Sequence, residues 1–169
     1  MSYSNEQLLT TNLILDSKDL NNDIDNTIKY KLKSQIEGRC HEDGYIVEDS
    51  VVIIKRSMGK VITNNGKSEI KYLITYKAKL ISPSEGDEFT VYISNINKMG
   101  VLSYIKLGTK ESEKSEDSPL VIMIPRDYFT ESSRNVEDLT IGQTLNVSIV
   151  GCRIKYLSDK IQAVAKPIE

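Results

Sequence analysis

The stretch IKYLITYKAKLISPSEGDEFTVYISNINKMGVLSYI, residues 70–105, decides how the chain is organised. Apolar residues recur at every second position of its first part: Tyr72, Ile74, Tyr76, Ala78 and Leu80. A period of two with aromatic and β-branched residues predicts a half-buried strand. The segment 83–86 then brings a proline and a glycine among polar residues, which is typical of a turn. We therefore expect two domains, 1–82 and 83–169, divided at this turn.

Alternation resumes after the turn and predicts which side chains face outward. Phe89, Val91 and Ile93 share one face of the next strand, so Tyr92 takes the other face. A second strand follows the turn NKMG, and its Tyr104 falls on the same outer side. Two tyrosines on adjacent strands offer a surface on which nucleic-acid bases can stack. The pattern is equally compatible with two ordinary surface tyrosines.

The C-terminal half contains five candidate strands: 89–96, 101–107, 120–124, 144–154 and 160–165. The connection between the third and the fourth strand is long enough for a helical turn. Five short strands with one longer connection at this place predict a closed Greek-key OB barrel. The segment 109–119 is poor in apolar residues and rich in both charges, so we expect a mobile insertion there.

The N-terminal half combines one helix with strands, which predicts an α+β domain. Its helix spans 21–36, with Ile24, Ile28, Leu32 and Ile36 on one face. Asn21 or Asn22 is the expected N-cap, and Gly38 is expected to end the helix. Strands are expected at 39–47, at 50–55 with a continuation at 61–63, and at 69–80, with a tight turn at 64–66. For residues 1–20 an edge strand is one possibility, and the pattern leaves the matter open.

Basic residues are concentrated between Lys55 and Lys79, although the whole chain has a formal net charge of -2. Seven basic residues lie in this segment against a single acid, Glu69. Such a patch indicates a face for an anionic partner, either RNA or an acidic protein surface. Lysines along the strand are compatible with simple solvation, whereas the cluster 55–60 favours contact.

Composition also indicates which kinds of site to expect. Two cysteines, Cys40 and Cys152, and one histidine, His41, are too few for a disulfide scaffold or a tetrahedral Cys/His zinc site. We find no phosphate-binding glycine loop and no nucleophile–histidine motif. No apolar run approaches the roughly 20 residues that cross a bilayer. We therefore expect a non-catalytic intracellular protein without cofactor, metal or membrane contact.

Several segments resemble one family. YKAKLISPSEGDEF followed by INKMG, together with KLKSQIEGRCHEDGYI and GKVITNNGKSEIKYLITYKAKL, resembles the stalk subunit of multisubunit DNA-directed RNA polymerases. That family comprises an archaeal stalk subunit and the seventh subunit of eukaryotic RNA polymerase II. The resemblance implies a helix-plus-sheet tip domain that docks on the polymerase core near the clamp and pairs with a second stalk subunit. It implies core contacts from KRSMGK, namely Lys55, Arg56, Met58, Gly59 and Lys60.

The C-terminal half resembles the S-one type of OB domain, which binds single-stranded RNA and is named for a ribosomal protein. The tyrosine surface and nearby basic residues are then the expected RNA contacts: Tyr92, Lys98, Tyr104, Lys106 and Arg126. S-one domains usually carry an aromatic residue just after the first-hairpin glycine and another aromatic residue or a histidine on the third strand. This chain has Leu102 and Met123 at those places, which predicts weak, non-specific RNA binding.

These patterns predict a non-catalytic polymerase stalk subunit whose barrel contacts emerging RNA during transcription. The alternative is a free-standing OB-fold RNA-binding adaptor of translation or RNA decay. The abundance of Asn, Lys and Ile suggests an AT-rich genome, such as that of a large DNA virus with its own polymerase. Nucleus, cytoplasm and virion all stay open as the place of action, as does the identity of the partner subunit.

Overall fold

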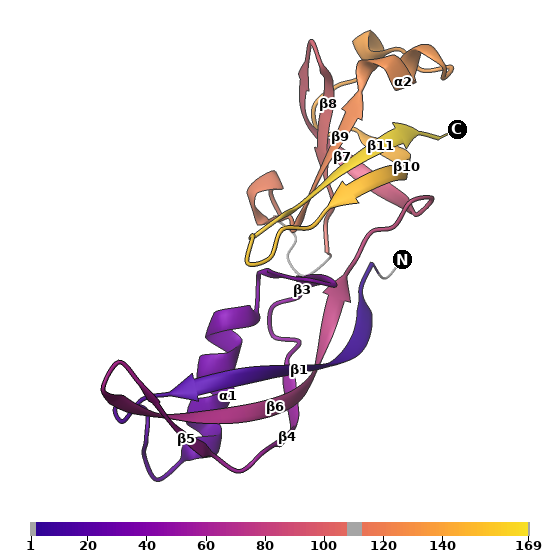
Figure 1. Ribbon diagram of the computed structural model, residues 1–169. Helices are drawn as coiled ribbons and strands as arrows, with labels where there is room; N and C mark the ends of the chain where they lie inside the picture. Colours follow the sequence, from indigo (N-terminus) through magenta and orange to yellow (C-terminus); the bar gives the residue numbers. More distant parts are fainter. Residues whose placement is uncertain (1–2, 108–112, 169) are drawn as a thin grey trace. The chain divides into compact units, whose positions relative to one another are not determined.

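The computed structural model describes residues 3–107 and 113–168, which form two compact units (Figure 1). The first unit contains the residues up to Gly38 together with Ile46–Ile81. The second contains Arg39–Tyr45 together with the residues from Ser82 onward. The segment Arg39–Tyr45, inside the expected N-terminal range 1–82, thus groups with the C-terminal half.

The long strand β6 (Lys67–Ile81) organises the antiparallel sheet of the first unit. Strand β1 (Asn5–Leu15) pairs with it along one edge, in register from Asn5 with Leu80 to Leu15 with Ile70. Strands β4 (Val52–Arg56) and β5 (Lys60–Asn64) pair with the other edge. The open question over residues 1–20 is thereby resolved, because most of them form an edge strand.

The helix α1 (Ile24–Ile36) lies along this sheet and supplies its apolar face to the core (Figure 1). Ile28 and Leu32 are buried against the alternating residues of β6, including Ile74 and Tyr76. This arrangement confirms the predicted helix and the inward face of the strand. Burial of such side chains is the main force that stabilises the unit, at about 1.5–3 kcal/mol for each large one.

The helix cap differs from the prediction. The N-cap is Asp23 rather than Asn21 or Asn22. The Asn21 side chain instead accepts a hydrogen bond from the Asp23 backbone N–H at 2.9 Å, so it shapes the turn before the helix. The helix ends where it was expected to, since Gly38 has φ 71 and its N–H donates to the Ile46 carbonyl.

Two strand predictions in this half were wrong. The segment 39–47 is a hairpin of β2 (Cys40–His41) and β3 (Gly44–Ile46), because Glu42 and Asp43 form a two-residue turn. The segment 61–63 lies in β5, which is a separate strand and does not continue β4. The chain leaves the ladder at Ser57, whose N–H and Oγ both bond to the backbone of Leu73.

Five strands of the second unit close into an OB-like barrel (Figure 1). They are β7 (Glu88–Asn97), β8 (Gly100–Tyr104), β9 (Leu120–Pro125), β10 (Thr144–Arg153) and β11 (Ile161–Pro167). Around the barrel the order is β7-β8-β9-β11-β10, and the β9–β11 pair is parallel. The helix α2 (Arg126–Thr130) and the 3₁₀ turn η2 (Val136–Asp138) occupy the long connection. All five expected strands are therefore present.

The side chains that alternation in the sequence predicts to face inward do line the barrel interior. Phe89, Val91 and Ile93 are buried, and across the β7–β8 pair Val101 and Ser103 point inward as well. The buried Ser103 hydroxyl donates to the Ile122 carbonyl at 3.1 Å, so its polar group is satisfied.

The expected insertion at 109–119 is only partly visible. Residues 109–112 lie outside the described residues, and a 3₁₀ turn, η1 (Ser115–Asp117), occupies part of the remainder. Within the described ranges, no helix is both long and apolar enough to span a bilayer.

Substitution of Gly100 provides a test of the close approach between β8 and β9. Its φ is +148, and a Cβ there would lie 2.1 Å from the Ile124 carbonyl oxygen. We predict that Gly100→Ala lowers the free energy of unfolding by roughly 2–3 kcal/mol, because rigid backbone must shift. Gly151→Ala is the control, since its Cβ meets nothing within 4 Å. Urea unfolding of both variants is the measurement, and equal stability would contradict this account.

Candidate functional site

The β7–β8 pair places Tyr92 and Tyr104 directly opposite one another on the outer surface of the barrel. Their ring centroids lie 5.8 Å apart with an interplanar angle of 31°. The Lys106 Nζ lies 4.3 Å from the centroid of the Tyr92 ring, within the range of a cation–π contact. The strand register thus confirms that the two tyrosines share one surface, and it adds a cation at its edge.

Two other expected RNA contacts lie away from this pair. Lys98 is exposed in the β7–β8 turn, and the exposed Arg126 begins α2. The Arg126 N–H donates to the Met99 carbonyl, so both cations belong to the turn end of the hairpin. Tyr104 lies four residues along β8 from Gly100, which corresponds to about 13 Å of extended chain. The structure thus gathers Tyr92, Tyr104 and Lys106 but leaves Lys98 and Arg126 at the other end.

Outward residues of neighbouring strands line up in two rows across the barrel. In the first row Tyr104 lies opposite Val121 on β9, and Val121 lies opposite Gln162 on β11. In the second row the partners are Leu102, Met123 and Val164. The tyrosine pair therefore continues without interruption into an aliphatic surface.

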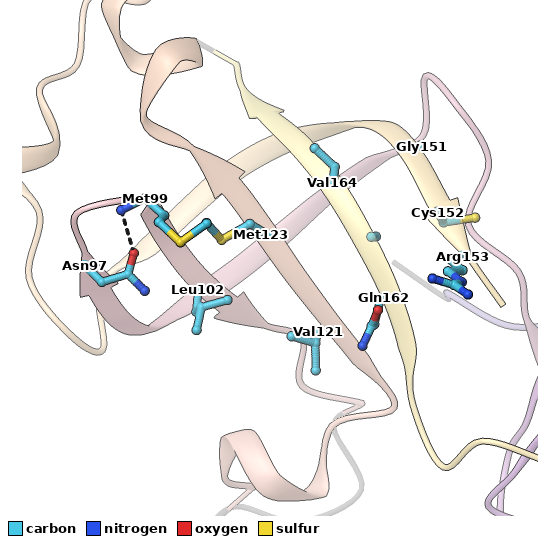
Figure 2. A pocket seen from close by; sticks show the side chains of 11 residues that line it. Asn97, Met99, Leu102, Val121, Met123, Gly151, Cys152, Arg153, Gln162 and Val164 are labelled. Carbon is cyan, nitrogen blue, oxygen red and sulfur yellow. Dashed lines mark hydrogen bonds between the residues drawn. The ribbon is translucent and has the colours of Figure 1, made fainter. Parts of the chain in front are cut away.

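This aliphatic surface is hollowed into a groove of about 690 Å³ (Figure 2). Its apolar lining comes from β8, β9, β11 and the β7–β8 turn: Met99, Leu102, Val121, Met123, Ala163 and Val164. Figure 2 shows the side chains of Met99 and Met123 extending toward one another. Gly151 lies opposite Val164 in the β10–β11 ladder and contributes no side chain. The groove is thus an open apolar channel on the outside of the barrel.

Cys152 also lines the groove, and its surroundings favour the neutral thiol. Its Sγ donates to the Pro83 carbonyl at 3.0 Å. Burial is the main cause that raises the pKa of this thiol, and the carboxylate of Asp87 raises the pKa further. The neutral thiol form therefore dominates at neutral pH, in keeping with an apolar lining.

A second, cationic hollow adjoins the groove. It measures about 210 Å³ and shares Arg153 and Gln162 with the groove. Its other lining residues are Lys155, Ser158 and Lys160. Lys160 is held by a hydrogen bond from Nζ to the Ser115 carbonyl at 3.3 Å. The combination can accept a phosphate or a carboxylate.

In the first unit, only residues 57–59 of the expected loop KRSMGK lie outside the strands, because Lys55 and Arg56 belong to β4 and Lys60 begins β5. Arg56 donates from Nε to Asp25 Oδ1 at 2.6 Å and lies 5.4 Å from the Tyr72 ring centroid. Gly59 passes so close to Ile70 and Tyr72 that a Cβ would lie within 3.0 Å of their side chains. Met58, by contrast, is 90% exposed. Arg56 and Gly59 thus hold the loop in place, whereas Lys55, Met58 and Lys60 face solvent.

The chain matches no model of a known protein family. The groove residues Val121, Gln162 and Val164 and the cationic residues Arg153, Lys155 and Lys160 were not singled out from the sequence. Leu102 and Met123 were noted only as departures from an aromatic pattern. The alternation in β9 and β11 was the available signal, but it does not reveal which strands become neighbours.

The contacts of Arg56 predict a structural role. We expect Arg56→Ala to lower the free energy of unfolding by about 1 kcal/mol, because it removes an exposed ion pair and a cation–π contact. Lys55→Ala is the matched control and should leave stability unchanged. Urea unfolding of Arg56→Ala, Asp25→Ala and the double variant measures the coupling. Additive effects would show that the Arg56–Asp25 pair does not stabilise the fold.

Proposed function

We propose that this chain is a non-catalytic stalk subunit of a DNA-directed RNA polymerase whose barrel binds emerging single-stranded RNA. The Tyr92–Tyr104 pair with Lys106 is the observation that carries the RNA part of the proposal. Adjacent outward-facing rings provide a stacking surface, and each stacked base contributes about 1–3 kcal/mol. The polymerase part is supported by the sequence resemblance to the stalk family and by the combination of a helix-plus-sheet unit with an OB-like barrel.

The solvent-facing side of the first unit suits the docking role. Met58 is exposed between Lys55 in β4 and Lys60 in β5, within the segment that the resemblance assigns to the polymerase core. An exposed methionine between cations fits an apolar recess with acidic surroundings on a partner. The second stalk subunit is the other partner that the resemblance implies.

Base stacking makes a specific prediction for RNA binding. We expect the double variant Tyr92→Ala/Tyr104→Ala to weaken binding of an oligouridylate about tenfold or more, since 1.4 kcal/mol corresponds to tenfold. Tyr30→Ala is the control, because Tyr30 is 78% exposed on α1 and lies outside the barrel. Fluorescence anisotropy at fixed salt measures both. Unchanged affinity in the double variant would overturn the tyrosine site.

Co-purification tests the polymerase assignment independently. A tagged chain expressed in its natural source should recover the large polymerase subunits and one small partner. We expect Met58→Glu to reduce this recovery strongly, because a buried unpaired carboxylate is costly, whereas Tyr92→Ala/Tyr104→Ala should not affect it. Recovery of ribosomal or RNA-decay proteins instead would favour the alternative, a free-standing RNA-binding adaptor.

A further inference from the structure

The groove on the barrel lacks the features that hold a base. No residue among the described ones that line it carries an aromatic ring, so it offers no flat surface for stacking. Asn97 Oδ1, at its rim, already accepts the backbone N–H groups of Met99 and Gly100. The other long polar side chains of the lining, Arg153 and Gln162, lie at the end that the groove shares with the cationic hollow.

The same lining suits aliphatic or aromatic side chains of a peptide. Met99 is 75% exposed and Val164 is 38% exposed, which is unusual for large apolar residues grouped in one hollow. Clustered exposed apolar residues of this kind mark interaction sites. Methionine adapts its shape to the side chain that it receives, and two methionines border this groove.

The positive charge of the cationic hollow indicates which residue type follows the apolar part of such a peptide. The cationic hollow begins where the groove ends, because Arg153 and Gln162 line both. Lys155 and Lys160 add two further positive charges. Among the described residues that line the two hollows, none carries a carboxylate. A ligand that spans both therefore gains electrostatic attraction only if its second part is anionic.

We propose that the groove and the cationic hollow together bind a peptide segment of another protein, in which apolar side chains are followed by several carboxylates. The apolar side chains occupy the space above Leu102 and Met123. The carboxylates lie against Arg153, Lys155 and Lys160. The RNA surface at Tyr92 and Tyr104 adjoins this site but is separate from it, and the inference does not depend on the polymerase assignment.

Nuclear magnetic resonance of the full ¹⁵N-labelled chain provides the test. The probe is a short synthetic peptide in which Leu-Phe-Leu precedes a run of Glu, and the comparison peptide has Lys in place of Glu. We expect the acidic peptide to shift the backbone amides of Leu102, Met123 and Arg153, with an affinity of about 10–100 μM. The basic peptide should bind at least about tenfold more weakly.

Substitutions at positions outside the core distinguish a loss of peptide binding from a loss of folding. Gly151→Met should block the groove without disturbing the core, because a Cβ at Gly151 meets nothing within 4 Å. Ile141→Gln is its control, since Ile141 is 69% exposed outside the groove. Lys155→Glu should weaken the acidic peptide about tenfold, whereas Lys166→Glu, outside both hollows, should not.

Two results would overturn the proposal. One is the absence of amide shifts with the acidic peptide at millimolar concentration. The other is that an oligouridylate shifts the amide signals of the groove residues and binds more weakly to the Gly151→Met variant. That result would make the groove part of an RNA site. Loss of RNA binding in Tyr92→Ala/Tyr104→Ala with peptide binding retained would support two separate sites.

Discussion

The outer surface of the barrel depends on one constraint, the hydrogen-bonded register of β7, β8, β9 and β11. Side chains alternate with a period of two, so a slip by one residue would turn Tyr104 into the core and Ser103 outward. The turn after β7 helps to fix this register, because Asn97 Oδ1 accepts two backbone N–H groups there. Gly100 then allows the chain to pass directly beside the Ile124 carbonyl. Both candidate binding surfaces depend on this register, which the β7–β8 turn fixes at one end.

Local pattern was sufficient to predict much of the fold. The alternation of Tyr72 to Leu80 and of Phe89 to Ile93 gives the buried faces, because hydrophobic burial selects one parity in each strand. It also places Tyr92 and Tyr104 on one outer side, but their direct pairing depends on the register shift between Ile93 and Asn95, which a period of two does not reveal. The hairpin at Cys40–Ile46 was missed although Asp43 and Gly44 are a turn signal, because its two strands are only two and three residues long and show no alternation.

The groove could not be predicted because it depends on contacts between residues far apart in the chain. Val121 and Gln162 become neighbours only through the parallel β9–β11 pair. The register of β10 with β11 shifts between Ile149 and Gly151, which sets the glycine opposite Val164. The pairing of β9 with β11 skips β10 in chain order, and a bulge adds a single residue to a strand. Neither feature produces a periodic pattern in a single sequence. The placement of Arg39–Tyr45 has the same origin, since the Cys40 N–H and carbonyl bond to Ser158 and Leu157.

Leu102 and Met123 mark the place where the aromatic part of the outer barrel surface ends and the aliphatic part begins. An aromatic residue at either place would extend the stacking surface of Tyr104 along the strands, whereas the aliphatic side chains interrupt it and leave a hollow. Contacts to phosphates weaken steeply with salt because they release counterions, but burial of apolar side chains does not depend on counterions. In the two functions that we propose, Tyr92, Tyr104 and Lys106 bind RNA loosely while a protein segment occupies the adjoining aliphatic groove. Because Arg153, Lys155 and Lys160 contribute charge to the proposed peptide site, salt would remove that part of the affinity and leave the apolar part.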